Sequence, residues 1–273
     1  MIKRRLKGIL LEILEIIPAK ILINFKKIHY LRSLKNFNEK NEPDFEVVKY
    51  IARKGDTVFD IGANIGWYTK LLSELVGETG KVISIDPTPE TFLILSYCVK
   101  RLGLSNVNIL NCAISNKEGV CKMEVPKYDF GGLNFYQTRI TDNNKKNYLF
   151  KYFFAKTKSL DGFIPCFADT VSFIKCDVEG HELAVIKGAL SIISKFKPIW
   201  LIEVSSDPDQ TNSSAFELFK IMQENGYIAY WYKNQKLYKR IKGDKSINYF
   251  FITSERLKQL PKTVLYDFSI NEG

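Results

Sequence analysis

The stretch DTVFDIGANIGWYTKLLSELVGETGKVISIDP, residues 56–87, decides the fold of this chain. Its apolar runs predict a buried strand over Val58–Ile61, a helix over Trp67–Val76 and a second strand over Val82–Ile85. The second strand ends at a carboxylate, Asp86. A strand, a tight turn, a helix and a second strand form half of a βαβ unit, so we expect an α/β fold with a mostly parallel, doubly wound sheet.

The turn after the first strand reads D-x-G-x-N-x-G, from Asp60 through Gly62 and Asn64 to Gly66. Glycine lets a ligand approach the backbone, and asparagine tolerates the left-handed conformation that a tight turn requires. Asp86 follows Gly66 by 20 residues, the separation at which a second-strand carboxylate accepts hydrogen bonds from a ribose. The unit therefore predicts an adenosine-containing cofactor; the alternative is an ordinary turn without a ligand.

Two adenosine cofactors compete for this turn. A dinucleotide fold places G-x-G-x-x-G against a pyrophosphate, whereas here Asn64 takes the middle position and Asp60 ends the strand. Asp60 would repel a pyrophosphate, but it could hold the ammonium or sulfonium end of S-adenosylmethionine. We therefore expect S-adenosylmethionine, with an NAD-dependent oxidoreductase as the alternative.

The composition is that of a globular protein, since 45% of the 273 residues are hydrophobic and 26% are charged. The net charge of +10 is concentrated at the start, where residues 1–40 hold ten Lys or Arg against three Glu. We therefore predict a basic helical extension over residues 1–40 and a cofactor-binding domain over residues 41–273. The five cysteines are odd in number and form no C-x-x-C pair, which indicates reduced thiols in a cytoplasmic protein.

Residues 2–17 place apolar side chains on one helical stripe, and Pro18 starts a second basic helical stretch that ends near Phe37. Charged residues interrupt every window long enough to span a membrane, and Glu12 and Glu15 interrupt the apolar region that a signal peptide needs. Two interpretations of residues 1–36 stay open. They form a roof over the active site, or they make a peripheral contact with an anionic membrane.

The next helix should run from a cap at Thr88 to Gly103, followed by a strand over Val107–Leu110. Asn111 and Ala113 follow the carboxyl end of that strand, where open α/β sheets bind ligands. They are candidate adenine contacts.

The α/β order breaks over a variable insertion at about residues 126–157. We expect a β-hairpin around Gly131–Gly132 and a strand near Tyr148–Thr157. At least half of the aromatic side chains should be buried, and the rest could form a platform for the substrate. These aromatic residues are Tyr128, Phe130, Phe135, Tyr136, Tyr148, Phe150, Tyr152, Phe153 and Phe154.

Regular α/β order returns after the insertion. The expected elements are strands over Val171–Cys176, Ile199–Val204, Tyr227–Tyr232 and Asn248–Thr253, and helices over His181–Ser194 and Ser214–Asn225. The closing helix, strand, charged hairpin and strand resemble the antiparallel edge that ends class I methyltransferase sheets.

The sequence FIKCDVEGHE, residues 173–182, gathers ionisable groups at the end of a strand. Lys175 and Asp177 share one face of this strand, and Glu179 and His181 follow them. Methyl transfer to oxygen needs an aligned acceptor and a base for its proton. Histidine titrates near neutral pH, so His181 is the favoured base, while Lys175, Asp177 and Glu179 position the acceptor. Alternatively, His181 and Glu182 only open the next helix.

A divalent metal ion is a second interpretation of this region. Asp177, Glu179, His181 and Glu203 offer the oxygen and imidazole ligands that such an ion uses. Their spacing matches no recognised metal signature, so we expect a site without a metal and keep the ion as the less favoured alternative.

The segments DTVFDIGANIGWYT (56–69) and FIKCDVEGHE (173–182), with TKSLDGF (157–163) between them and LIEV (201–204) after them, resemble the FkbM-type methyltransferase family. The resemblance covers about residues 42–204. It implies a class I, Rossmann-like fold that uses S-adenosylmethionine and, most often, methylates a hydroxyl of a sugar, glycolipid or secondary metabolite. By this likeness Asp60, Gly62, Asn64, Gly66 and Asp86 carry the cofactor. The family commonly has Glu at the position of Asp86, and the shorter carboxylate can still bind a ribose.

The remaining alternatives are a nucleic-acid methyltransferase and a non-catalytic module. A nucleobase methyltransferase would show an N/D-P-P-Y-type turn where this chain has the acidic run from Asp177 to Gly180, so we expect no nucleic-acid partner. A module that only docks a membrane or a partner would be favoured by loss of the glycine turn or of Asp86, and both are present. The expected acceptor is a small molecule, a glycan or a glycolipid.

Overall fold

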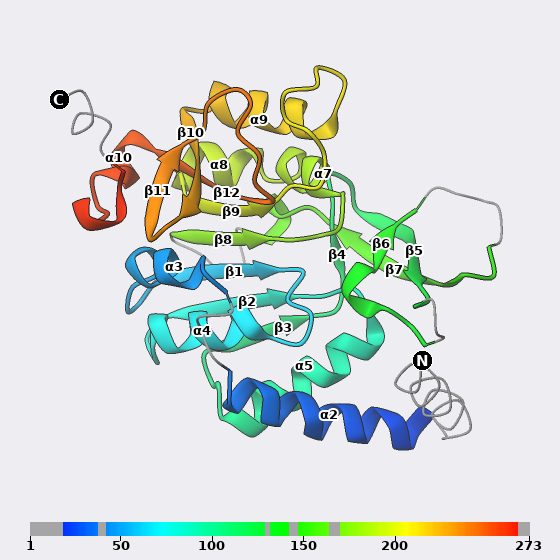
Figure 1. Ribbon diagram of the computed structural model, residues 1–273. Helices are drawn as coiled ribbons and strands as arrows, with labels where there is room; N and C mark the ends of the chain where they lie inside the picture. The colour runs from blue at the N-terminus through cyan, green and yellow to red at the C-terminus, as the bar shows by residue number, and fades with distance from the viewer. Residues whose placement is uncertain (1–18, 38–41, 129–131, 142–146, 164–169, 267–273) are drawn as a thin grey trace, which may run out of the picture.

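The computed structural model describes residues 19–37, 42–128, 132–141, 147–163 and 170–266. An eight-stranded sheet in the order β11-β10-β12-β9-β8-β1-β2-β3 forms the centre, and a four-stranded sheet in the order β4-β7-β5-β6 lies beside it (Figure 1). The helix predicted over residues 2–17 lies outside the described residues. The strands of the large sheet are β1 (Thr57–Ile61), β2 (Lys81–Ile85), β3 (Val107–Leu110), β8 (Phe173–Cys176), β9 (Ile199–Glu203), β10 (Tyr227–Lys233), β11 (Lys236–Lys239) and β12 (Asn248–Thr253).

The strand directions confirm the predicted class I methyltransferase fold. Strands β3, β2, β1, β8 and β9 pair in parallel, whereas β12 lies antiparallel between β9 and β10. All five residues of β1 are buried, because a parallel sheet is covered on both faces.

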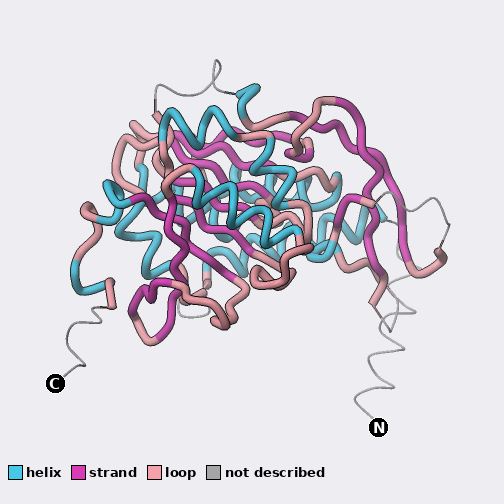
Figure 2. Tube along the Cα trace, turned by 90° about the horizontal axis from the view of Figure 1, so that it is seen from above, coloured by secondary structure: helices cyan, strands magenta, loops and turns pink. Residues whose placement is uncertain are grey.

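Helices cover both faces of the large sheet (Figure 2). Phe59 and Ile61 pack with the residues of α7 to α9 on one face, whereas Val58 packs with α3 and α4 on the other. This alternation along β1 follows from the period of two in a strand. The helices are α2 (Ala19–Lys35), α3 (Phe45–Ile51), α4 (Trp67–Val76), α5 (Pro89–Leu102), α7 (Glu182–Lys187), α8 (Leu190–Phe196), α9 (Ser214–Glu224) and α10 (Ser254–Leu257).

Helix α2 packs on the domain through α5. Leu34 is only 1% exposed and joins Ile94 and Cys98 in one apolar cluster. Lys26 on α2 also forms an ion pair with Glu90 on α5. Removal of α2 would therefore uncover an apolar surface.

The small sheet lies beyond the carboxyl ends of β1, β2 and β8 (Figure 1). It contains β4 (Ala113–Ile114), β5 (Gly119–Pro126), β6 (Arg139–Ile140) and β7 (Phe150–Lys158). β5 pairs with β7 along its whole length, and β6 pairs with β5 at Met123 and Glu124. An antiparallel bridge pairs Lys127 with Leu133, in agreement with the predicted hairpin, while residues 129–131 lie outside the described residues.

The prediction that half of the aromatic side chains in the insertion are buried is wrong. Among those that the structure describes, none is fully buried, and Tyr148 and Phe154 are 90% and 73% exposed. The buried positions of β5 and β7 belong to smaller side chains, including Met123, Val125 and Ala155. From Phe154 to Lys158, β7 alternates between exposed and buried positions, so one of its faces is exposed.

The single helix predicted over His181–Ser194 is also wrong, since α7 and α8 are separate helices. A side chain at Gly188 would place its Cβ 2.2 Å from the carbonyl oxygen of Ser115, so the backbone passes a neighbouring loop too closely for any larger residue. Asp161 then caps α8, because its carboxylate accepts hydrogen bonds from the amides of Ser191 and Ile192 at 2.9 and 3.0 Å.

Candidate active site

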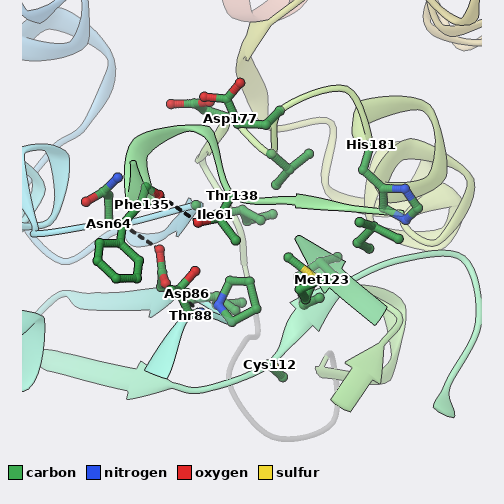
Figure 3. Close-up of a pocket in the computed structure, with 18 of the residues that line it drawn as sticks. Ile61, Asn64, Asp86, Thr88, Cys112, Met123, Phe135, Thr138, Asp177 and His181 are labelled. Atoms are coloured by element: carbon green, nitrogen blue, oxygen red, sulfur yellow. Dashed lines mark hydrogen bonds between the residues drawn. The ribbon is translucent and has the colours of Figure 1, made fainter. Parts of the chain in front are cut away.

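A cavity opens at the carboxyl ends of β1, β2 and β8 and encloses about 570 Å³ including its mouth (Figure 3). Its walls come from the turn after β1, the loop after β2, the segment after β3 and the small sheet. The lining includes Gly62, Asn64, Asp86, Pro87, Thr88, Cys112, Ala113, Met123, Phe135, Tyr136, Thr138, Asp177, Glu179 and His181. We call it the first cavity.

Asp86 is the best-held side chain in the first cavity. Its Oδ1 accepts hydrogen bonds from the amide of Thr88 at 2.9 Å and from Thr91 Oγ1, and its Oδ2 accepts one from the amide of Asn64 at 2.9 Å. A carboxylate has about four acceptor positions, so Oδ2 keeps one for a ligand hydroxyl. Burial raises the pKa of Asp86 to about 6, although these hydrogen bonds lower it, so the group is mostly ionised at neutral pH.

The turn between β1 and α4 brings backbone to the cavity surface. Gly62 has φ +76°, and a Cβ there would lie 1.7 Å from the carbonyl oxygen of Asp177. Asn64 has the left-handed conformation predicted from the sequence, with φ 49°. Its Oδ1 is buried and has no hydrogen-bond partner within the described part of the chain, so it is an acceptor in need of a donor.

Three predicted cofactor residues support the site without lining either cavity. Asp60 is fully buried, accepts a hydrogen bond from Thr69 Oγ1 at 2.6 Å, and lies away from the space where a cofactor would sit. Gly66 begins α4, and Asn111 donates a hydrogen bond from Nδ2 to the backbone oxygen of Asp86 at 2.8 Å. The predicted contact of Asp60 with the charged end of the cofactor does not agree with this placement. Gly62, Asn64, Asp86 and Ala113 do line the first cavity.

A second cavity, of about 760 Å³ including its mouth, adjoins the first and shares Gly62, Asn64, Tyr136 and Asp177 with it. The two form one continuous surface around the turn after β1. The other residues that line the second cavity are Glu42, Ala63, Trp67, Tyr68, Lys175, Cys176, Leu201, Glu203 and Asn248.

Lys175 fixes the boundary between the two cavities. Its Nζ donates hydrogen bonds to the backbone oxygen of Gly62 and to Asp177 Oδ2, both at 3.1 Å, and lies 3.9 Å from Asp60 Oδ1. Burial lowers the pKa of Lys175, but the negative charges of Asp177 and Asp60 raise it by more, so that the pKa lies above its ordinary value. Lys175 therefore stays protonated and orients Asp177, and it is not a base.

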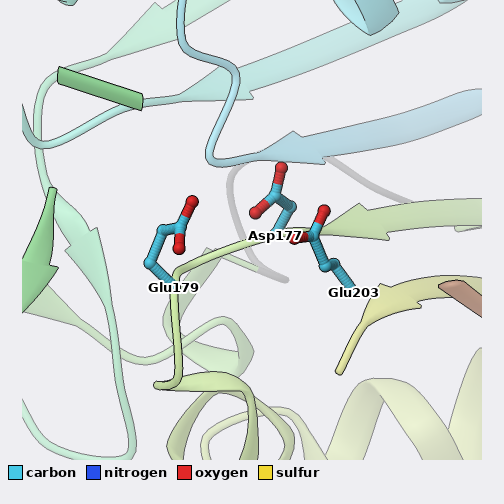
Figure 4. A group of neighbouring side chains, drawn as sticks. All are labelled: Asp177, Glu179 and Glu203. Carbon is cyan, nitrogen blue, oxygen red and sulfur yellow. The ribbon is translucent and has the colours of Figure 1, made fainter. Parts of the chain in front are cut away.

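Three carboxyl groups meet at this boundary, with oxygens of Asp177, Glu179 and Glu203 within 4.8 Å of one another (Figure 4). Burial and the charge of Asp177 raise the pKa values of Glu179 and Glu203 to about 7 in each case. Glu182 adds to the shift at Glu179, and Glu179 adds to the shift at Glu203. Both glutamates can therefore exchange a proton near neutral pH.

His181 lies apart from these carboxyl groups. Its Nε2 forms a 2.9 Å hydrogen bond with Ser115 Oγ, and it lines the first cavity but not the second. It occupies the N-cap position of α7 without a side-chain capping bond. Of the four candidate metal ligands, Asp177, Glu179 and Glu203 come together, and His181 does not join them. The structure thus places His181 on the wall of the first cavity with Asp177 and Glu179, whereas Lys175 lines only the second cavity.

Residues 60–229 match the sequence family described as the methyltransferase FkbM domain. The chain belongs to the FkbM methyltransferase family. This result confirms the resemblance found in the two sequence motifs, and S-adenosylmethionine is the cofactor of this methyltransferase fold.

The relatives of this FkbM protein either match a short part of the chain or match most of it at low sequence identity. The protein-L-isoaspartate O-methyltransferase 2 of Archaeoglobus fulgidus is 38% identical over 58 residues, which cover 21% of this chain and 26% of that protein. The crystal structure of a methyltransferase FkbM from Methylobacillus flagellatus KT is 18% identical, covers 80% of this chain and 52% of that chain, and has a TM-score of 0.47. A methyltransferase from Aquifex aeolicus that depends on S-adenosylmethionine is 19% identical, with 81% and 94% coverage and a TM-score of 0.43. The chain thus spans about a quarter of the length of this protein-L-isoaspartate O-methyltransferase.

The first cavity of the FkbM protein fits the adenosine part of S-adenosylmethionine. Asp86 has a free acceptor position, and Asn64 Oδ1 lacks a donor among the described residues. Cys112 and Met123 add an apolar wall that suits a purine.

Several lining residues were not predicted from the sequence. The sequence places Phe135 and Tyr136 only in a general aromatic platform, and it indicates Glu203 only as a possible metal ligand. Trp67 and Tyr68 also line the second cavity and belong to the helix predicted after the glycine turn. Their position in the first turn of that helix, next to the glycine turn, was the signal that could have identified them.

Proposed function

We propose that this protein is an O-methyltransferase that uses S-adenosylmethionine to methylate a hydroxyl of a glycan, a glycolipid or another small molecule. The observation that carries this proposal is the meeting of the carboxyl groups of Glu179 and Glu203 at the boundary of the two cavities, within 4.8 Å of each other and of Asp177. Burial, which raises the pKa of each glutamate to about 7, supports it. When bound, the cofactor supplies a methyl group, whose bond to sulfur breaks with the electron pair left on sulfur while a new bond forms to the acceptor oxygen.

The hydroxyl must lose its proton during this transfer, and a carboxylate with a pKa near the working pH is suited to accept it. Lys175 stays protonated and holds Asp177 and the turn in place. This proposal moves the base from His181 to the carboxyl groups, because His181 Nε2 is engaged by Ser115 Oγ at 2.9 Å and His181 does not join the cluster of carboxyl groups.

Product analysis tests this function. The purified protein is incubated with S-adenosylmethionine that carries a ¹³C-labelled methyl group, together with neutral methyl glycosides and methyl glucosaminide, which also offers an amine, and the product is examined by NMR. We expect the labelled carbon on oxygen. A label found on nitrogen or on carbon would contradict O-methylation, and calorimetry that shows binding of NAD but not of S-adenosylhomocysteine would contradict the methyltransferase itself.

We further propose that the acceptor is met at an anionic membrane surface. Ile21, Phe25 and Ile28 on α2 are 48%, 63% and 44% exposed and follow the helical spacing of one stripe. Arg32 and Lys35 continue the exposed face in the last turn of the helix. No helix of the described residues is long and apolar enough to cross a membrane. An apolar stripe followed by basic residues is the pattern of a helix that lies on an anionic bilayer.

Helix α2 also contacts the rim of the site. Tyr136, which lines both cavities, donates a hydrogen bond from its hydroxyl to Tyr30 on α2 at 3.3 Å. A membrane contact through α2 would therefore bring the cavities close to the lipid surface.

Liposome sedimentation tests the membrane contact. Replacement of Ile21, Phe25 and Ile28 by Ser should abolish sedimentation with anionic liposomes and leave the affinity for S-adenosylhomocysteine unchanged. Ile241→Ser is the matched control, because Ile241 is 63% exposed in a different region. Point variants are preferable to deletion of residues 1–36, which would uncover the buried cluster around Leu34. Equal sedimentation of the triple variant and the control would exclude α2 as the contact.

A further inference from the structure

The second cavity is lined mainly by acidic groups, which do not suit an anionic ligand. Its described lining holds three carboxyl groups, Glu42, Asp177 and Glu203, against one lysine, Lys175. That lysine is already engaged, because it is hydrogen-bonded to Asp177 and to the turn after β1. A phosphate or carboxylate that enters this cavity would therefore face repulsion from three groups and find its possible counterion occupied.

The polar side chains of this cavity come from two neighbouring strands. Glu203 is the last residue of β9, and its Cα is paired with that of Asn248 at the start of β12. The amide of Asn248 is held by a hydrogen bond to Asp44 Oδ2 at 2.6 Å, which fixes its orientation. A fixed amide beside a carboxylate provides the hydrogen-bonding groups that a ligand with hydroxyls requires.

Glu203 and Glu179 differ in the cavity that they face. Glu203 lines the second cavity and Glu179 the first, whereas Asp177 lines both. Neither glutamate has a hydrogen-bond partner within the described ranges, so each has its carboxylate available. Asp177, in contrast, is paired with Lys175 at 3.1 Å. Among the three carboxyl groups at the boundary, Glu203 is thus the one that is both unpaired and turned toward the more polar cavity.

We propose that the second cavity receives the acceptor, that Glu203 takes the proton of its reacting hydroxyl, and that the cavity selects acceptors without a phosphate or carboxylate beside that hydroxyl. This inference rests on the proposed O-methyltransferase function. In the reaction the acceptor oxygen gains the methyl group, its O–H bond breaks, the proton moves to the Glu203 carboxylate, and the cofactor leaves as the neutral thioether. Trp67 and Tyr68 add aromatic surface to this cavity, which suits the apolar face of a sugar ring.

Glutamine variants test the role of Glu203. Glu203→Gln keeps the size of the side chain but cannot accept a proton, so we expect the rate constant for methyl transfer to fall about a hundredfold or more. The affinity for S-adenosylhomocysteine, measured by calorimetry, should stay unchanged, and the melting temperature should not fall, because the variant removes repulsion among carboxylates. Glu224→Gln is the matched control, because Glu224 on α9 is exposed and lines neither cavity. An equal or larger loss of rate in Glu179→Gln would assign the proton to Glu179 and overturn the inference.

Acceptor probes test the selectivity. Protein saturated with S-adenosylhomocysteine is examined by saturation-transfer NMR with the methyl glycosides of glucose, galactose, mannose, rhamnose and fucose, and with the 1-phosphates of glucose, galactose and mannose. We expect binding of at least one neutral glycoside, weaker or absent binding of every phosphate, and loss of the glycoside signal in a variant that blocks the cavity, Asn248→Trp.

The outcomes separate the inference from the function on which it rests. Preferential binding of the phosphates, or no binding of any neutral glycoside, would overturn the inference while cofactor binding stays intact. Failure of S-adenosylhomocysteine to bind would instead remove the proposed function as a whole. Methylation of the amine in methyl glucosaminide in place of a hydroxyl would also contradict the assignment.

Discussion

The ionisation of Asp86 should control the affinity for the cofactor. Three donors hold this carboxylate, from Asn64, Thr88 and Thr91, and Oδ2 keeps one position for a ligand hydroxyl. In Asp86→Asn the amide oxygen can face Thr88 and Thr91, but its NH₂ group then meets the amide of Asn64 donor to donor. Loss of a charge-assisted hydrogen bond costs about 1.5 to 3 kcal/mol, so the affinity for S-adenosylhomocysteine should fall roughly ten- to a hundredfold.

The dependence of the cofactor affinity on pH is a second test of Asp86. Burial raises the pKa of Asp86 to about 6, and we expect the ionised form to accept the hydrogen bond of a ribose hydroxyl at its free position. With this pKa, about nine tenths of the Asp86 carboxyl groups are ionised at pH 7 and about one tenth at pH 5, so the affinity should be about tenfold lower at pH 5 than at pH 7. The unfolded chain has the ordinary pKa of 3.8, so the fold binds this proton more tightly, and this group stabilises the fold as the pH falls from 7 through 6 toward 4. Weaker binding at pH 5 would therefore not reflect unfolding caused by Asp86.

Calorimetry with S-adenosylhomocysteine between pH 5 and pH 7 measures both effects. Asp207→Asn is the control, since Asp207 is an exposed loop residue that lines neither cavity. An affinity that is flat across this range, or equal in the wild type and Asp86→Asn, would refute the role of Asp86 in cofactor binding.

Two further predictions concern the turn and the carboxyl groups. Gly62→Ala should abolish cofactor binding, because the new Cβ would lie 1.7 Å from the Asp177 carbonyl oxygen. Gly103→Ala is the control and should keep cofactor binding, because Gly103 has a similar φ of +70° and no atom lies within 4 Å of its Cβ. Equal affinities of the two variants would show that the close contact at Gly62 is unimportant. Treatment with EDTA should leave methyl transfer unchanged, and a loss that added Mg²⁺ restores would show instead that Asp177, Glu179 and Glu203 bind a metal ion.

The cofactor half of the site could be predicted from the sequence because its determinants are local. The turn from Gly62 to Gly66 and the carboxylate at Asp86 belong to one βαβ unit, whose geometry depends on a few consecutive residues. The left-handed conformation of Asn64 and the bounds of α4 followed from the same local rules. The antiparallel position of β12 followed from the order of elements at the end of the chain.

The acceptor half could not be predicted in the same way, because it depends on contacts between distant segments. Glu203 and Asn248 meet only through the pairing of β9 with β12. The separation of α7 from α8 at Gly188 depends on the loop at Ser115, and the hydrogen bond to that serine holds His181 away from the carboxyl groups. No periodicity in the sequence contains this information.

A crystal structure with S-adenosylhomocysteine bound would test the central claim most directly. The account predicts that the adenosine occupies the first cavity with a ribose hydroxyl on Asp86, and that the sulfur lies at the boundary of the two cavities and faces the space lined by Glu203. Adenosine bound outside the first cavity, or a sulfur directed away from Glu203, would contradict it.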